Sequence, residues 1–117
     1  MINIVHSGDT MSMTLNIIVT HPEDAILFVD SSPANKIKVE EYNTRVSALA
    51  GFVSQNTTTI SSTIFEQTLI FDSLSSFQYF LIFEQNQSIY RERGQYNREN
   101  GITGVRTMID NSTGNTI

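Results

Sequence analysis

The chain has 117 residues, of which 39% are hydrophobic and only 16% are charged, and its formal net charge is −5 at pH 7. This length provides one domain with a single core, and the acidic balance argues against binding to duplex nucleic acid, since each neutralised phosphate requires a cation. The absence of cysteine excludes disulfide bonds, thiolate metal sites and cysteine nucleophiles, and the longest nearly apolar run, Phe77–Phe83, is too short to cross a bilayer as a helix.

Alternation of apolar and polar residues marks the segment from residue 11 to residue 20. Because successive side chains of an extended chain point to opposite faces, this spacing predicts a half-buried antiparallel strand. A turn at 6–10 precedes it, and the short apolar run at 2–5 predicts an edge strand. The apolar residues at every second position are Met11, Met13, Leu15, Ile17 and Val19.

The next segments alternate between turn signals and short apolar runs. A proline predicts a turn at 21–24, and the apolar run at 25–29 predicts a strand that ends in a loop at 30–35. Apolar residues alternate with charged ones at 36–40, which favours another strand. Residues 43–54 fit both a short helix and a strand, and we favour the helix.

The second half of the chain contains its most apolar segments. The segment at 77–84 predicts a central aromatic strand that is apolar on both faces, with Phe80 and Ile82 together on one of them. The second apolar face is then available to a partner. In order, we expect a loop or wet hairpin at 55–62, a strand at 63–72, a turn at 73–76, the strand at 77–84, a tight hairpin at 86–87 and a return strand at 88–93.

Seven or eight short strands separated by turns at short intervals are typical of a β-sandwich or barrel. We therefore expect an all-β fold, an antiparallel, immunoglobulin-like β-sandwich of about seven or eight strands with one possible short helix, formed by residues 1–94. After residue 94 the chain becomes polar. Residues 95–117 are expected to form a polar C-terminal tail or a weak final strand.

No motif in the chain identifies a reaction. The sequence has no Gly-x-Ser-x-Gly elbow, no Walker loop and no Gly-x-Gly-x-x-Gly run. His6 and His21 lie at opposite ends of the first long strand, too far apart to share a metal ion, and the carboxylates in the turns lack the spacing of a calcium loop. We therefore expect no catalytic residue, no metal site and no cofactor, and we interpret the protein as non-enzymatic.

Two stretches of the chain carry a family resemblance. Residues 7–19, Ser-Gly-Asp-Thr-Met-Ser-Met-Thr-Leu-Asn-Ile-Ile-Val, join a Gly-Asp-Thr turn to an alternating strand, and residues 74–94 join a Tyr-containing strand to a return that ends at a glycine. In this order and spacing they resemble the opening and the closing hairpin of immunoglobulin-like β-sandwich domains in tailed-phage baseplate and fibre proteins. The resemblance implies an attachment or assembly module of a bacteriophage virion, assembled in the host cytoplasm.

The sequence thus predicts a structural protein that docks on other virion proteins or on copies of itself as a homo-oligomer, and that binds neither nucleic acid nor membrane. Two alternatives stay open: a small acidic inhibitor from a mobile element that binds a host protein, and a ligand-binding small β-barrel. Tyrosine and arginine are enriched at protein interfaces. The residues expected at an interface are Phe80, Ile82, Tyr90, Arg91, Arg93 and Tyr96.

Overall fold

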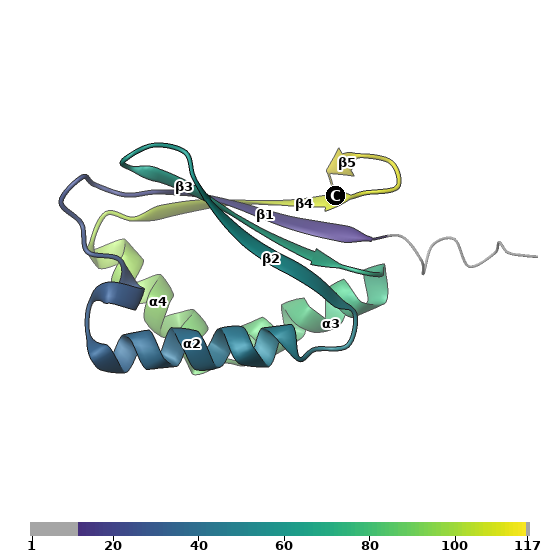
Figure 1. Ribbon diagram of the computed structural model, residues 1–117, viewed down its shortest axis with the longest axis horizontal. Helices are drawn as coiled ribbons and strands as arrows, with labels where there is room; N and C mark the ends of the chain where they lie inside the picture. The colour runs from purple at the N-terminus through teal and green to yellow at the C-terminus, as the bar shows by residue number, and fades with distance from the viewer. Residues whose placement is uncertain (1–11, 117) are drawn as a thin grey trace, which may run out of the picture.

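The computed structural model describes residues 12–116, which form one sheet with a layer of helices on one of its faces (Figure 1). The chain starts in the sheet, crosses to the helical layer, returns as a hairpin, and crosses again before its last long strand. In chain order the elements are β1 (Met13–Thr20), the 3₁₀ turn η1 (Phe28–Asp30), α2 (Pro33–Ser47), β2 (Phe52–Thr59), β3 (Ile64–Phe71), α3 (Leu74–Gln85), α4 (Ser88–Glu99), β4 (Thr103–Asp110) and β5 (Asn115–Thr116).

The strands lie in the order β2-β3-β1-β4-β5, and each neighbouring pair is antiparallel. Strand β1 is central, so that Leu15 faces Leu69 of β3 on one side and Met108 of β4 on the other. Helix α2 connects β1 to β2, and the pair α3–α4 connects β3 to β4. The chain thus contains two β-α-β units, and in the sheet the two strands of each unit are separated by one strand of the other unit. This is the ferredoxin-like arrangement.

The expectation of an all-β, immunoglobulin-like sandwich is therefore wrong, because the protein has an α+β fold with a single sheet. The strands expected at 36–40, 77–84 and 88–93 are helical and lie in α2, α3 and α4. A short apolar run has no period that separates a buried strand from a buried helix segment, and the flanking capping residues decide between them.

Two of the strands expected from the sequence are confirmed. Residues 13–20 form β1 and residues 64–71 form β3. The wet hairpin, one of two interpretations of residues 55–62, is present as the end of β2 and its connection to β3. The edge strand expected at 2–5 and the turn expected at 6–10 lie outside the described residues.

Two further expectations in the first half of the chain need correction. The run at 25–29 is not a strand but leads into the 3₁₀ turn η1. The helix favoured at 43–54 is displaced, since α2 starts at Pro33 and ends at Ser47 while residues from Phe52 onward belong to β2. Helix α2 contains the whole charged segment at 36–40 and buries Tyr42 and Val46 after it.

Serine caps start α2 and α3. The Ser32 hydroxyl accepts a hydrogen bond from the backbone N–H of Asn35 at 3.0 Å, and Pro33 occupies the first helical position, where a missing N–H costs nothing. The Ser73 hydroxyl accepts from the backbone N–H of Ser76 at 3.2 Å. Turns and helix caps use the same residue types. Among residues 12–116 there is no helix long and apolar enough to span a membrane.

Because α3 is a helix, Phe80 is buried in the core whereas Ile82 is exposed to solvent. Phe77, Phe80 and Glu84 follow the i, i+3, i+7 spacing of one helix face and are buried. Ile82 lies on another face and is 62% exposed. A strand would have placed Phe80 and Ile82 on the same face, so the pair discriminates between the two conformations.

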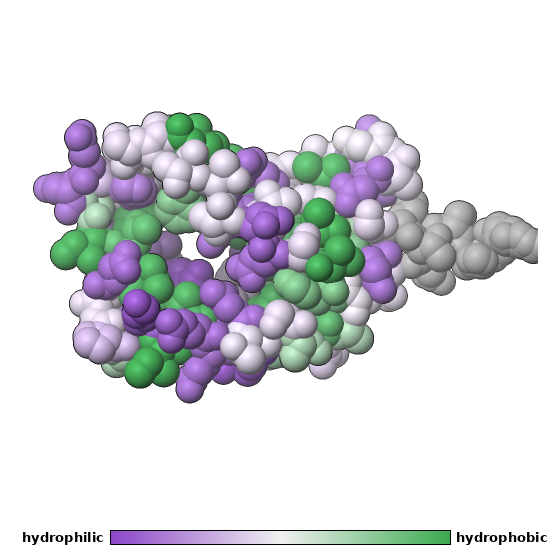
Figure 2. Space-filling model, in the orientation of Figure 1, coloured by the Kyte–Doolittle hydropathy of each residue, from purple (hydrophilic) through white to green (hydrophobic). Residues whose placement is uncertain are grey.

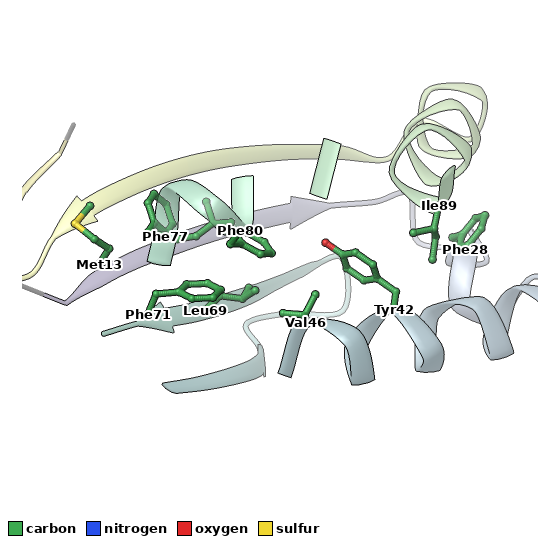
Figure 3. Packing of buried hydrophobic residues seen from close by; sticks show 10 residues of the cluster. Met13, Phe28, Tyr42, Val46, Leu69, Phe71, Phe77, Phe80 and Ile89 are labelled. Atoms are coloured by element: carbon green, nitrogen blue, oxygen red, sulfur yellow. The ribbon is translucent and has the colours of Figure 1, made fainter. Parts of the chain in front are cut away.

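An aromatic cluster fills the space between α3 and the sheet (Figure 3). Phe71 of β3 is fully buried, and its ring centroid lies 4.8 Å from that of Phe80 and 6.0 Å from that of Phe77. Phe52 packs edge-on against Phe71 at 5.9 Å. This core occupies the end of the sheet where β1 begins and β3 ends, and it holds α3 in place.

The boundary expected between residues 94 and 95 falls inside helix α4. Residues 103–110 form β4, which pairs with β1 along its whole length and is followed by the short strand β5. Met108 of β4 packs against the core. The segment from 95 to 110 therefore completes α4 and forms β4, so it belongs to the helical layer and to the sheet.

We predict that Phe80→Ala lowers the free energy of unfolding by about 3–5 kcal/mol, because it leaves a cavity inside the aromatic cluster. Ile82→Ala, two residues along the same helix, is expected to change it by less than about 0.5 kcal/mol. Urea unfolding followed by far-UV circular dichroism measures both values. Similar losses for the two variants would contradict the helical assignment of this segment.

Candidate functional site

A cleft of about 590 Å³ lies between the sheet and the helical layer, at the end of the sheet opposite the aromatic core. Figure 2 shows the molecule hollowed between the sheet and α2, with hydrophilic residues around the opening. Residues of β1, β3 and β4 form its roof, α2 and α4 form its walls, and the last turn of α3 closes it toward the core.

The inner face of the sheet changes character along the strands. In the register, the row of Leu15, Leu69 and Met108 is apolar and belongs to the core. The next row joins Ile17 to Gln67 and Arg106, which line the cleft. The row after it ends on Gly104, which has no side chain to fill the space. The cleft thus exists because the core stops two rows short of the end of the sheet.

Helix α4 presents one face to the cleft. Ile89, Arg93 and Asn97 follow one another at intervals of four residues and therefore lie on the same side of the helix. Ile89 packs into the core, whereas Arg93 and Asn97 reach the open part of the cleft. The change from apolar to polar along this helix face matches the change along the sheet.

Glu84 and Arg106 form a bidentate ion pair at the end of the cleft that is nearest to the core. The Nη1 and Nη2 atoms of Arg106 donate to Oε2 and Oε1 of Glu84 at 3.1 and 2.8 Å. Burial by itself lowers the pKa of Arg106, but the hydrogen bonds and the charge of Glu84 outweigh this effect and raise it. The two-point geometry fixes both side chains and ties the end of α3 to β4.

Arg93 is held differently, because its guanidinium lies between two aromatic rings. The Cζ atom of Arg93 is 5.9 Å from the ring centroids of both Phe28 and Tyr42. Burial lowers its pKa, and the neighbouring Tyr42 and Glu84 partly offset that shift. Among the described residues Arg93 has no hydrogen-bond acceptor and no ion-pair partner. It is a half-buried cation whose N–H donors are available.

The Tyr42 side chain reaches from α2 into the space below the sheet, with its hydroxyl away from the helix (Figure 3). Its ring stacks on that of Phe83 at a centroid distance of 6.3 Å, and the residue is 9% exposed. Burial and the nearby Glu84 raise the pKa of Tyr42 well above its ordinary value. No described residue makes a hydrogen bond to this hydroxyl, so a neutral donor faces the cleft next to Arg93.

The cleft concentrates positive charge in an acidic protein. Four of the seven lysine and arginine residues of the chain line it, whereas Glu84 is the one carboxylate among the described lining residues. Arg93 and Arg106 lie inside, while Arg91 and Arg98 are exposed at the rim. A low-dielectric wall strengthens the field of such charges. The arrangement favours an anion.

A second hollow of about 140 Å³ adjoins the first and is lined mostly by apolar residues from η1, α2 and the sheet. The two hollows share Val19, Gln67, Arg93 and Asn97. Phe28 lies on the far wall of the smaller hollow. A ligand that spans both would bury an apolar body beside Phe28 and place a negative group at Arg93.

The residues expected at an interface from the sequence lie in four places. Phe80 is in the core and Ile82 is exposed on α3, away from the cleft. Three of the others line the cleft, and the Tyr96 hydroxyl donates to the backbone carbonyl of Ile26. Their role at an interface between chains stays a prediction. The three in the cleft are Tyr90, Arg91 and Arg93.

Sequence reasoning did not identify Tyr42, Glu84 or Arg106 as site residues. Glu84 and Arg106 come from elements that were interpreted as a strand and as a tail, and only the register of β4 on β1 brings them together. The clustering of arginine and tyrosine at 90–98 was the signal in the sequence. Among residues 12–116 no group of three or more His, Asp or Glu side chains is placed to hold a metal ion.

No family model and no curated protein matches this sequence. Among solved structures, the fold matches that of SnoaB, described as a cofactor-independent oxygenase from Streptomyces nogalater, in an asparagine-to-alanine mutant form. The TM-score is 0.53 at 13% sequence identity, and the match covers 86% of this chain and 91% of that chain. At this identity the likeness establishes a shared fold.

The comparison overturns the resemblance to phage baseplate and fibre domains, because the matching structure is an oxygenase and not an immunoglobulin-like module. The interpretation as a virion structural protein, which depended on the sandwich, is wrong for the same reason. The expectation of a protein without enzymatic function also needs correction, because the solved structure that shares this fold is described as an oxygenase, and at 13% identity that activity is stated of that protein alone. Of the three functions considered from the sequence, ligand binding agrees best with a cleft beneath the sheet.

Because the neutral form of Tyr42 is favoured in the folded protein, its contribution to stability is present below about pH 10, the ordinary pKa of tyrosine. It is lost as the pH rises toward the raised pKa. We predict that the free energy of unfolding falls more steeply above about pH 10 in the wild type than in Tyr42→Phe. Denaturant titrations at a series of alkaline pH values measure this. Parallel pH profiles for the two proteins would contradict the burial of this phenol.

Proposed function

We propose that the cleft binds a small organic anion with a flat apolar body, and that the protein acts on this ligand as an enzyme. The observation that carries the proposal is the half-buried Arg93, which lacks a carboxylate partner among the described residues. Burying a charge is costly unless it is paired. An anionic ligand supplies the missing partner and offsets that cost.

The walls of the cleft support the apolar half of the proposal. Ile17, Val19 and Ile89 line it, and the adjoining hollow beside Phe28 is largely apolar. A volume of about 590 Å³ lies within the range of sites for small molecules. Ligand pockets typically combine such apolar walls with a few polar groups that fix orientation. Here Arg93 and the Tyr42 hydroxyl are those groups.

The chemistry that this site favours is the ionisation of an enol or a phenol, whose O–H bond breaks and whose proton is released to solvent water at the open mouth of the cleft. A fixed guanidinium stabilises negative charge that develops on a substrate oxygen, and a neutral Tyr hydroxyl donates a further hydrogen bond to it. An electron-rich anion of this kind reacts with molecular oxygen more readily than its neutral form. The fold shared with a cofactor-independent oxygenase supports oxygen as the second substrate of this proposed reaction.

Binding of 2-naphthoate, a flat aromatic monoanion, tests the proposal most directly. We expect Arg93→Met to weaken this binding by about 10- to 100-fold, because it removes a charge-assisted hydrogen bond while a linear side chain still fills the space between Phe28 and Tyr42. Isothermal titration calorimetry or tyrosine fluorescence measures the dissociation constant. The neutral analogue 2-naphthalenemethanol is expected to bind both proteins equally.

Arg45→Met is the matched control for this test, because Arg45 is exposed on α2, does not line the cleft and changes the net charge equally. It is expected to leave the affinity for 2-naphthoate within about twofold, since exposed charges are screened by salt. Equal affinities of wild type and Arg93→Met would contradict the assignment of the cleft as an anion site.

For the reaction, we predict that the protein accelerates oxygen consumption by 1,4-dihydroxy-2-naphthoate, a monoanion with ionisable phenols. Arg93→Met should reduce the rate above background by about tenfold or more, since it removes the stabilisation of the developing oxyanion. An oxygen electrode measures the rate, with Arg45→Met as control. A rate that Arg93→Met leaves unchanged, or that equals the protein-free background, would contradict the proposed reaction.

A further inference from the structure

We infer that the Glu84–Arg106 ion pair sets the charge of the ligand, so that the cleft selects monoanions over dianions. This inference deepens the proposed function and rests on it. The pair is built into the interior: Glu84 is 8% exposed, and both of its carboxylate oxygens accept from Arg106. The inner cleft therefore holds two cations and one anion.

The preference for monoanions follows from the number of charged side chains inside the cleft. Arg106 is neutralised by Glu84 at hydrogen-bond distance, which leaves the charge of Arg93 to be matched by a ligand. One negative group satisfies Arg93. A second negative group would meet a guanidinium whose fork is already occupied, and it would lie near the carboxylate of Glu84, which repels it.

The Glu84–Arg106 pair is more rigid than a typical ion pair at the surface. The other ion pair in residues 12–116, Lys38–Glu92, joins α2 to α4 through a single contact with both side chains about half exposed. Glu84 and Arg106 are joined by two parallel hydrogen bonds, and their side chains are 11% and 30% exposed. Fork-to-fork pairs hold their orientation, so a ligand does not readily displace Glu84.

The test compares 2-naphthoate with naphthalene-2,3-dicarboxylate at pH 7.5, where the second probe is a dianion. The wild type is expected to prefer the monoanion. Glu84→Gln frees the charge of Arg106 and should shift the ratio of the two dissociation constants toward the dianion by about tenfold or more. The double variant Glu84→Gln with Arg106→Gln restores the original count and should return the ratio to its wild-type value.

Gln67→Lys provides a variant that leaves the buried pair intact. Gln67 lies beside Ile17 in the same row of the sheet and lines the cleft, so a lysine there adds a cation. It is expected to shift the ratio in the same direction as Glu84→Gln. This variant keeps the inference testable if the loss of the Glu84 charge prevents folding, which a thermal unfolding curve of each variant reveals.

The outcomes separate the two proposals. If the wild type binds 2-naphthoate through Arg93 but neither Glu84→Gln nor Gln67→Lys shifts the ratio, the inference about charge selection is overturned and the proposed function stands. If the wild type binds neither probe, both are overturned. A shift in Glu84→Gln that the double variant reverses supports charge counting, because a purely structural effect of the substitution would persist in the double variant.

Discussion

A half-buried guanidinium that has no carboxylate partner within residues 12–116 is the constraint on which the arrangement of the site depends. Arg93 is held between the rings of Phe28 and Tyr42, and these contacts offset only part of the cost of removing it from bulk water. The remaining cost is tolerable because the cleft is open and because Glu84 lies within electrostatic reach. In the function proposed here the same imbalance attracts an anion, so the cost of burying Arg93 in the free protein and the affinity for the ligand have one origin.

The rest of the molecule makes this imbalance possible. The aromatic cluster around Phe71 provides the packing at one end of the sheet, where α3 contacts β3 closely. Because stability is concentrated there, the other end can leave rows such as Ile17–Gln67 without a packed helix above them. Functional sites commonly carry such a local departure from good packing.

Period-two spacing identified β1 correctly, and the segment of β3 was also correctly expected to be a strand; the two strands pair with each other and lie inside the sheet. It failed at 77–84, where almost every residue is apolar and neither period is favoured. The capping serine Ser73 was the local signal for a helix. The site could not be predicted from the sequence alone. Glu84 and Arg106 come into contact only because α3 and α4 connect β3 to β4 and because β4 pairs with β1.

The surface of the protein and its cleft carry charges of opposite sign. The chain carries a net charge of −5, yet the cleft gathers four of its seven basic residues. A small inorganic anion is repelled by the acidic surface and gains nothing from apolar walls such as Ile17 and Val19. An anion with an apolar ring gains from burial of its body as well as from Arg93. The acidic surface repels both kinds of anion alike, so the discrimination between them that we propose comes from the apolar wall, while Arg93 supplies the positive charge inside the cleft.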